Sequence, residues 1–265
     1  APRRGTAILV PPWKIRSPRL LAGWARIARR AGLDAWLLVP PHHLERAAPG
    51  ARSGEAFVSA DLSRLRGALV QTALEIRLCA AAAAPRGEVA LVGLSLGALS
   101  AAWALRGRER IDAALLVAPP ADLPAVFRET PIGRRYAALA ARAGVPLPRA
   151  EVLDPLLRAL APLDRPPAGA RILVAGGTED RIALSGPALL ARAWGVPLRL
   201  YPRGHLTLLL ACAALRRDAR GFLGGGAGGA SGCSWTGVGV ATGRATGGFL
   251  AAQAAAVAAA TTSAT

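Results

Sequence analysis

The stretch Val89-Ala90-Leu91-Val92-Gly93-Leu94-Ser95-Leu96-Gly97 decides the fold, because it joins an apolar run to a helical pattern through a G-x-S-x-G turn. The run Val89–Val92 is apolar throughout, which is typical of a strand buried on both faces of a parallel sheet. A helical pattern from about Ala98 to Leu105 follows it directly. The stretch therefore predicts a strand, a sharp turn and a helix, with the hydroxyl of Ser95 exposed above the sheet.

The glycines of this motif have a steric reason, since a Cβ at Gly93 or Gly97 would collide with the neighbouring strand or helix. The motif alone is weakly specific, because chance gives roughly one match in eight chains of this composition. The strand before it and the helix after it make the match informative. We therefore predict that Ser95 is a nucleophile; the other reading is a glycine-rich turn with a solvated serine.

Short apolar runs alternate with longer helical patterns along most of the chain. This alternation predicts an α/β fold with a mostly parallel central sheet of about six strands flanked by helices. The expected strands are Thr6–Val10, Trp36–Val39, Val89–Val92, Ala113–Val117, Arg171–Val174 and Leu198–Tyr201. The expected helices are Leu20–Ala31, Leu62–Ala80, Ala98–Leu105, Pro187–Trp194 and Leu206–Phe222.

Two segments interrupt the alternation. Residues 121–170 contain helical patterns and many prolines between two strands, which predicts a helical lid inserted into a domain spanning 1–223. Residues 224–265 are a low-complexity tail of Gly, Ala, Ser and Thr, which we expect to be disordered. A non-native origin of this tail is the alternative. The chain contains no methionine, which favours a truncated or processed N-terminus.

The composition narrows the classes of function. The 265 residues are 52% hydrophobic and carry a formal charge of +17, with Lys14 the only lysine among 33 basic residues. This arginine bias is typical of a GC-rich, bacterial genome. The arginines are not interleaved with aromatic residues, so we expect no nucleic-acid partner, only a mild preference for anionic substrates.

The sequence also predicts the cellular location of the protein and the state of its cysteines. We find neither a signal peptide nor a run of about 18 strongly apolar residues, so we expect no transmembrane segment. The three cysteines Cys79, Cys212 and Cys233 form no disulfide or zinc pattern. A reducing, cytoplasmic location fits best, and the sequence does not determine whether the protein forms a homo-oligomer.

A nucleophilic serine needs a base, and the chain has three histidines. His205 follows the last predicted strand and precedes the last helix, which places it at the carboxyl edge of the sheet. We therefore predict that His205 is the catalytic base. His42 and His43 lie in a loop without a third metal ligand at suitable spacing, so we expect them to have loop or supporting roles.

The base needs a carboxylate to hold its tautomer. Asp180 follows the fifth predicted strand in Gly176-Gly177-Thr178-Glu179-Asp180 and is the predicted partner. Asp122, just past the fourth strand, is the main competitor, and Glu179 is a second one. The order Ser95, Asp180, His205 is the order that α/β-hydrolases use.

Two backbone amides should hold the oxyanion that forms during acyl transfer. One is the amide of Leu96, which follows the nucleophile. The other should come from the turn after the first strand, Pro11-Pro12-Trp13. Since proline has no N–H, Trp13 is the first available donor and Lys14 the second.

Together these elements resemble the α/β-hydrolase superfamily from about Thr6 to Phe222. Val10-Pro11-Pro12-Trp13-Lys14-Ile15-Arg16-Ser17-Pro18 and Ser53-Gly54-Glu55-Ala56-Phe57 are similar to the α/β-hydrolase-domain-containing-18 group. The resemblance implies hydrolysis of a small-molecule ester, thioester or related acyl substrate without cofactor or metal. Two departures from the superfamily stand out. Pro11-Pro12 replaces the usual His-Gly. The superfamily's first two strands have no counterpart before Thr6, which would leave Trp36–Val39 at an open sheet edge.

The same scaffold also supports other functions. One alternative is a lyase, haloperoxidase or peptidase. Another is a binding module with a vestigial triad, for which a His205 nitrogen well out of reach of Ser95 would be expected. A basic nucleic-acid binder is the third.

Overall fold

The computed structural model describes residues 3–59, 61–163 and 169–225. The tail for which disorder is expected therefore lies outside the described residues, apart from positions 224 and 225. Asp164, in the predicted lid, lies outside them as well.

Within these described ranges, six parallel strands form one sheet in the order β2-β1-β3-β4-β5-β6, which confirms the predicted fold class. Their bounds are β1 Gly5–Val10, β2 Leu33–Leu37, β3 Glu88–Leu94, β4 Ala113–Val117, β5 Arg171–Gly177 and β6 Leu198–Tyr201. Because all six run in one direction, the loops after them meet at one edge of the sheet.

The second strand begins three residues earlier than its apolar run predicts. It starts at Leu33, directly after Gly32, which has a positive φ of 82°. This strand lies at a sheet edge and pairs with β1 only, so it tolerates the exposed Asp34. A search for continuous apolar residues misses such a half-buried strand.

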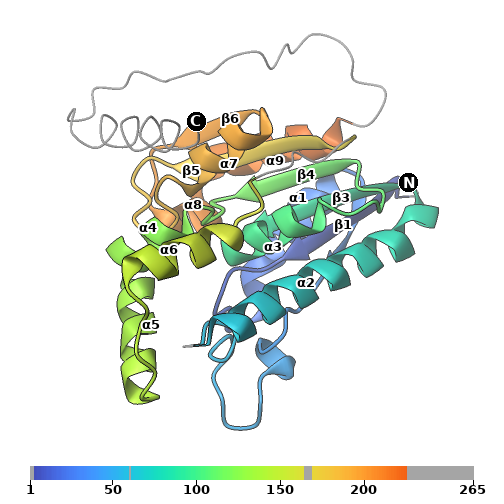
Figure 1. Cartoon of the computed structure of the whole chain (residues 1–265). Coiled ribbons are helices and arrows are strands. Elements are labelled where there is room, and N and C mark those ends of the chain that lie inside the picture. Colours follow the sequence, from blue (N-terminus) through green and yellow to red (C-terminus); the bar gives the residue numbers. More distant parts are fainter. Residues whose placement is uncertain (1–2, 60, 164–168, 226–265) are drawn as a thin grey trace.

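Helices cover both faces of the sheet (Figure 1). One face packs against α1 (Ala22–Arg30), α8 (His205–Ala211) and α9 (Ala213–Gly224). The other packs against α2 (Leu62–Ala83), α3 (Leu96–Ala104) and α7 (Gly186–Trp194). Successive residues of β1 point to opposite faces, with Leu9 in the first core cluster and Ile8 in the second.

The last predicted helix, Leu206–Phe222, is two helices that meet at Cys212. The backbone of Cys212 is extended there (φ −80°, ψ 100°), and its sulfur accepts a hydrogen bond from the amide of Leu215 at 3.4 Å. The apolar spacing continues across this break, which is why the sequence pattern suggests one helix.

The described residues between β4 and β5, within the segment predicted as a lid, form three helices: α4 (Leu123–Glu129), α5 (Pro131–Arg142) and α6 (Ala150–Ala159). Tyr136 and Leu157 from this segment share a third core cluster with Leu69 of α2 and Leu99 of α3. The segment is thus packed on the domain through apolar side chains. Its function as a lid stays a prediction.

In the part of the chain that the structure describes, one helical segment, Leu62–Arg86, is long and apolar enough to span a membrane, with a mean hydropathy of 1.3 over an 18-residue window. It comprises α2 and a following 3₁₀ turn, η3 (Ala84–Arg86), and its residues Ile76 and Ala80 are buried in the core beside the sheet. Core helices often meet the same criteria, so this segment is weak evidence for a membrane span.

Candidate active site

Ser95 occupies the sharp turn between β3 and α3. Its backbone has φ 53° and ψ −118°, a region that residues with a side chain rarely adopt. The amide of Ser95 donates to the carbonyl oxygen of Val117 on β4 at 2.8 Å, which fixes the turn against the sheet. Strain of this kind is characteristic of functional positions.

The two glycines of the motif let the chain pack closely here. A Cβ at Gly93 would lie 2.6 Å from the Cα of Ala98. One at Gly97 would lie 2.3 Å from the carbonyl oxygen of Val10 and 2.5 Å from that of Pro11. The helix after Ser95 therefore lies directly against the end of β1, from which the predicted oxyanion loop continues.

His205 reaches Ser95 from the start of α8. Its Nε2 lies 2.9 Å from the Oγ of Ser95, and its Nδ1 lies 2.7 Å from Oδ2 of Asp180. With the proton on Nδ1, the ring donates to Asp180 and accepts from the Ser95 hydroxyl. Three residues that are far apart in the sequence thus form one chain of hydrogen bonds.

Asp180 is almost completely buried, with 1% of its surface exposed. Its second oxygen, Oδ1, accepts hydrogen bonds from the amides of Ile182 at 2.8 Å and Ala183 at 2.9 Å. These two bonds orient the carboxylate, so that Oδ2 faces His205. Backbone donors of this type also offset the cost of burying the charge.

The competing carboxylates have other contacts. Asp122 caps α4 by accepting from the amide of Ala125 at 3.2 Å, and its other oxygen accepts from the Oγ of Ser185 at 2.6 Å. Asp154 of α6, which is not one of the candidates, pairs with Arg128 of α4. The carboxylate that contacts His205 is that of Asp180.

The two predicted oxyanion donors lie at the start of α3 and in the loop after β1. Leu96 is the first residue of α3, so its amide has no acceptor within the helix. Trp13 follows the end of β1, and its indole Nε1 donates to the carbonyl oxygen of Gly54 at 2.6 Å. The amide of Lys14, the alternative donor, is occupied by Nε2 of His43 at 3.3 Å. The assignment of Leu96 and Trp13 as donors remains a prediction.

His43 is a supporting residue whose contacts the sequence did not reveal. The side chain is fully buried against Phe57, and its Nδ1 donates to the carbonyl oxygen of Pro41 at 2.8 Å. Nε2 is then the acceptor for Lys14, and burial lowers the pKa of the ring, which favours this neutral form. His43 thereby joins the loop before α2 to the loop after β1. The His42–His43 pair in a long loop was the only sequence signal.

Neighbouring residues strengthen this connection. The Oγ of Ser53 donates to the carbonyl oxygen of Ile15 at 2.5 Å and accepts from the amide of Leu44 at 3.0 Å. Gly54 has a φ of 75°, and a Cβ there would lie 2.6 Å from Nε2 of His43. The stretch Ser53–Phe57 thus holds the loop that carries Trp13.

Positive charge surrounds this loop. The Nζ of Lys14 lies 4.6 Å from the centre of the Trp13 ring, and the Arg135 guanidinium lies 6.0 Å from it. Burial lowers the pKa of Lys14, and the nearby Arg135, Arg52 and Arg16 lower it further, whereas Glu55 acts in the opposite direction. Among the described residues, no group of three or more His, Cys, Asp or Glu side chains could hold a metal ion.

Comparison with solved structures identifies the class of fold. The chain is similar to an esterase from Pyrococcus furiosus (TM-score 0.53, 15% identity), covering 83% of each chain. It is also similar to a type II thioesterase of the yersiniabactin pathway, with a TM-score of 0.51 and 17% identity, covering 83% of this chain and 93% of that one. Mouse alpha/beta hydrolase domain-containing protein 10 is a third match, with a TM-score of 0.52 and 14% identity, covering 82% of this chain and 88% of that one. The fold is that of the α/β hydrolases.

The family follows from the sequence comparison. The model of the serine hydrolase family matches residues 73–209, just over half of the chain, which includes Ser95, Asp180 and His205. The chain belongs to this family. None of the curated proteins compared with it matches significantly. The narrower similarity to the α/β-hydrolase-domain-containing-18 group stays a prediction.

Proposed function

We propose that this serine hydrolase cleaves esters or thioesters through an acyl-enzyme, with Ser95 as nucleophile, His205 as base and Asp180 as the carboxylate that orients it. The observation that carries the proposal is the continuous hydrogen-bond chain, 2.9 Å from Ser95 to His205 and 2.7 Å from His205 to Asp180. Both distances allow proton transfer without rearrangement.

In the first half of the reaction, Oγ of Ser95 attacks the acyl carbon while its proton passes to Nε2 of His205. The carbonyl π electrons move to oxygen, and the amides of Leu96 and Trp13 stabilise the resulting oxyanion. The bond to the alcohol or thiol then breaks, and His205 returns the proton to this leaving group. Asp180 stabilises the imidazolium that exists between the two transfers.

In the second half, water replaces the leaving group. His205 takes a proton from the water as it attacks the acyl carbon, and the same two amides stabilise the second oxyanion. The bond to Ser95 breaks, Oγ regains the proton, and the carboxylic acid leaves. The chemistry needs no group beyond the side chains and amides named here.

The acyl group should bind beneath helices α4–α6, which we assign as the lid. Trp13, Leu96, Phe127 and Leu153 are partly buried side chains at the border of the third core cluster. They join the oxyanion loop, the nucleophile turn and the lid segment into one apolar surface. An acyl chain placed on this surface would leave its carbonyl carbon next to Ser95.

The proposal is tested with p-nitrophenyl esters, acyl thioesters and a fluorophosphonate, which phosphonylates an activated serine with loss of fluoride. Ser95→Ala should lower kcat by about 10⁴–10⁶-fold and abolish labelling. Ser100→Ala is the matched control, because Ser100 lies one turn along α3 and its hydroxyl donates to the carbonyl oxygen of Leu96 at 3.1 Å. Wild-type turnover in folded Ser95→Ala would contradict the proposal.

The alternatives make different predictions. A vestigial triad should have His205 out of reach of Ser95, whereas the two atoms lie 2.9 Å apart. Lyases on this scaffold, which do not transfer an acyl group, would not accumulate an acylated Ser95. Mass spectrometry of the protein quenched during ester turnover would therefore separate hydrolysis from those reactions.

A further inference from the structure

A cleft of about 240 Å³ lies between α1 and α9, on the face of the sheet covered by these two helices. Gly23 and Ile27 of α1 are among its lining residues. Five arginines complete its lining: Arg26 and Arg30 from α1, and Arg216, Arg217 and Arg220 from α9. No aspartate or glutamate of the described residues lines it.

The spacing of these arginines concentrates their charge. Arg26 and Arg30 are four residues apart on α1, and Arg216 and Arg220 are four apart on α9, so each pair shares one helix face. Like charges at this spacing destabilise a helix. The guanidinium of Arg216 lies against the α1 backbone at Gly23, since a Cβ there would be in van der Waals contact with Nη2 of Arg216 at 3.5 Å.

Some arginines elsewhere on the surface have acidic partners. Arg46 pairs with Glu75 at 2.6 Å, and Arg77 pairs with Glu109 at 2.5 Å. Asp218, the acidic residue within α9, instead accepts from the guanidinium of Arg199 at 2.6 Å. Its Oδ2 also accepts from the hydroxyl of Tyr201 at 2.8 Å.

The cleft arginines lack such partners. Within residues 3–59, 61–163 and 169–225, the five arginines of the cleft form no salt bridge. Residues 226–265, which follow α9, contain no aspartate or glutamate. The sequence therefore offers no acidic side chain directly after α9 that would neutralise the cleft.

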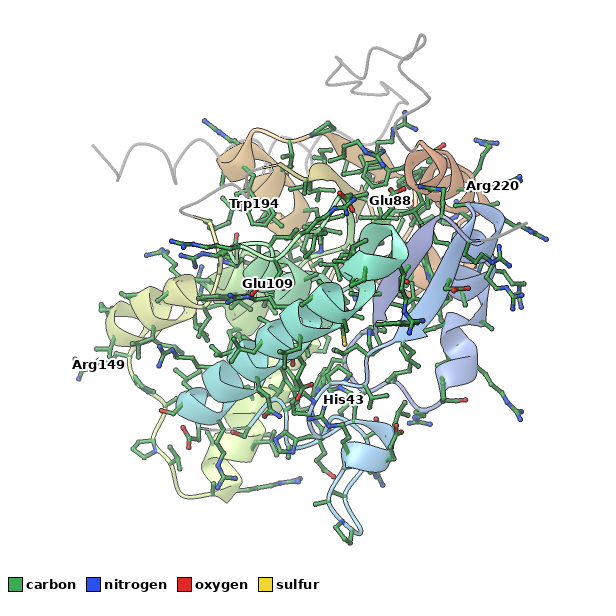
Figure 2. All side chains as sticks on the ribbon, turned by 90° about the vertical axis from the view of Figure 1, so that its right-hand side faces the viewer. His43, Glu88, Glu109, Arg149, Trp194 and Arg220 are labelled. Carbon is green, nitrogen blue, oxygen red and sulfur yellow. The ribbon has the colours of Figure 1, made fainter. Side chains whose placement is uncertain are left out.

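This cleft is separate from the candidate active site. The end of α9 contacts the amino end of β5, where Arg171 donates to the carbonyl oxygen of Phe222 at 3.1 Å. Ser95 and His205 instead follow the carboxyl ends of their strands. Figure 2 shows Arg220 at the border of the molecule, away from the loop that contains His43.

We propose that the cleft binds a small anion with two or more phosphate groups. Guanidinium groups match phosphate oxygens in charge and in the geometry of paired N–H donors. Five guanidinium groups on two facing helices carry more positive charge than one phosphate group would neutralise. The cleft volume of about 240 Å³ suits a compact ligand. An oligophosphate would replace the repulsion between the arginines with charge-assisted hydrogen bonds. Inorganic tripolyphosphate and the triphosphate of a nucleotide share this chemistry.

The experiment measures binding by calorimetry to the full chain, with inorganic phosphate, tripolyphosphate and a nucleoside triphosphate as probes. We expect saturable binding of both triphosphates, stronger than that of inorganic phosphate and weakened by added salt. A preference for the nucleotide would show that its base contributes, and equal affinity would assign the site to the phosphates alone. Failure of either triphosphate to saturate would overturn the proposal.

Charge-matched variants separate the cleft from the general positive charge. Arg26→Gln with Arg217→Gln should weaken tripolyphosphate binding at least tenfold. Arg66→Gln with Arg192→Gln removes the same charge from exposed positions on α2 and α7, outside the cleft, and should change it less than twofold. Equal weakening in both double variants would overturn the proposal.

Two further measurements complete the test. Thermal melts of each variant establish that it is folded. If the first cleft variant does not fold, Arg30→Gln with Arg220→Gln replaces it. A single-stranded oligonucleotide is the competing ligand. If it binds more tightly than tripolyphosphate and loses affinity in the cleft variants, the surface is a nucleic-acid site and the small-ligand proposal is wrong. Ester hydrolysis serves as a separate readout, so failure here leaves the proposed function unaffected.

Discussion

The substitution Gly54→Ala tests whether the loop before α2 positions the oxyanion loop. Gly54 has a φ of 75°, and a new Cβ would lie 2.6 Å from Nε2 of His43 and 2.9 Å from the amide nitrogen of Lys14. Both distances are too short for a real contact, so the hydrogen bond between His43 and Lys14 must break or shift. The neighbouring Trp13, which donates to the carbonyl oxygen of Gly54, would move with it.

Two contributions set the expected loss of stability. The left-handed backbone costs an alanine about 1–2 kcal/mol. Breaking the partly buried hydrogen bond between Lys14 and His43 adds about 1 kcal/mol. The free energy of unfolding should therefore fall by about 2–3 kcal/mol in Gly54→Ala.

The expected loss of activity follows from the oxyanion hole. Removing one donor typically lowers kcat by about 10²–10³-fold, and a displaced donor should lose part of that, about 10–100-fold. The loss should fall on kcat rather than KM, because the negative charge on oxygen develops only in the transition state. Steady-state hydrolysis of a p-nitrophenyl ester measures both constants.

Gly50→Ala is the matched control in the same loop. Gly50 has nearly the same φ, 76°, but a Cβ there would meet no atom within 4 Å. The control should therefore lose the strain energy of about 1–2 kcal/mol and keep its kcat. Equal kcat values in Gly50→Ala and Gly54→Ala would refute the reasoning that the loop before α2 positions the catalytic donor.

Three other outcomes follow from the contacts. Asp180→Asn should lower kcat by about 10⁴-fold. Asp122→Ala should instead keep the activity and lose about 1 kcal/mol of stability with its helix cap. The reverse pattern in kinetics and denaturant melts would reassign the acid. Burial lowers the pKa of His43 in the folded protein, so as the pH falls this residue is protonated in the unfolded chain before it is protonated in the folded one. The free energy of unfolding should therefore fall as the pH drops below about 6.5. His43→Gln should reduce this slope in thermal melts between pH 7 and 5, and an unchanged slope would mean that other groups cause it. Glu75→Gln should cost less than about 1 kcal/mol, since its partner Arg46 is partly exposed; a much larger loss in urea melts would contradict this.

The sequence by itself determined the fold class and the edge of the sheet where the site lies. Apolar runs of four or five residues alternating with helical patterns leave few arrangements other than a parallel sheet wrapped by helices. In such a sheet the carboxyl ends of all strands meet at one edge, so Ser95, Asp180 and His205 were expected there together. These inferences succeed because burial on both faces makes each strand apolar along its whole length.

The tertiary structure decided which of these side chains touch. Asp122 and Asp180 both follow strands, but the amides of Ile182 and Ala183 turn Asp180 toward His205, while Ser185 holds Asp122 elsewhere. The role of His43 is equally invisible in the sequence, because its partner Lys14 lies 29 positions away. Hydrophobic periodicity reports which face of an element is buried, whereas the direction of a polar side chain depends on partners that only the folded chain brings within hydrogen-bond distance.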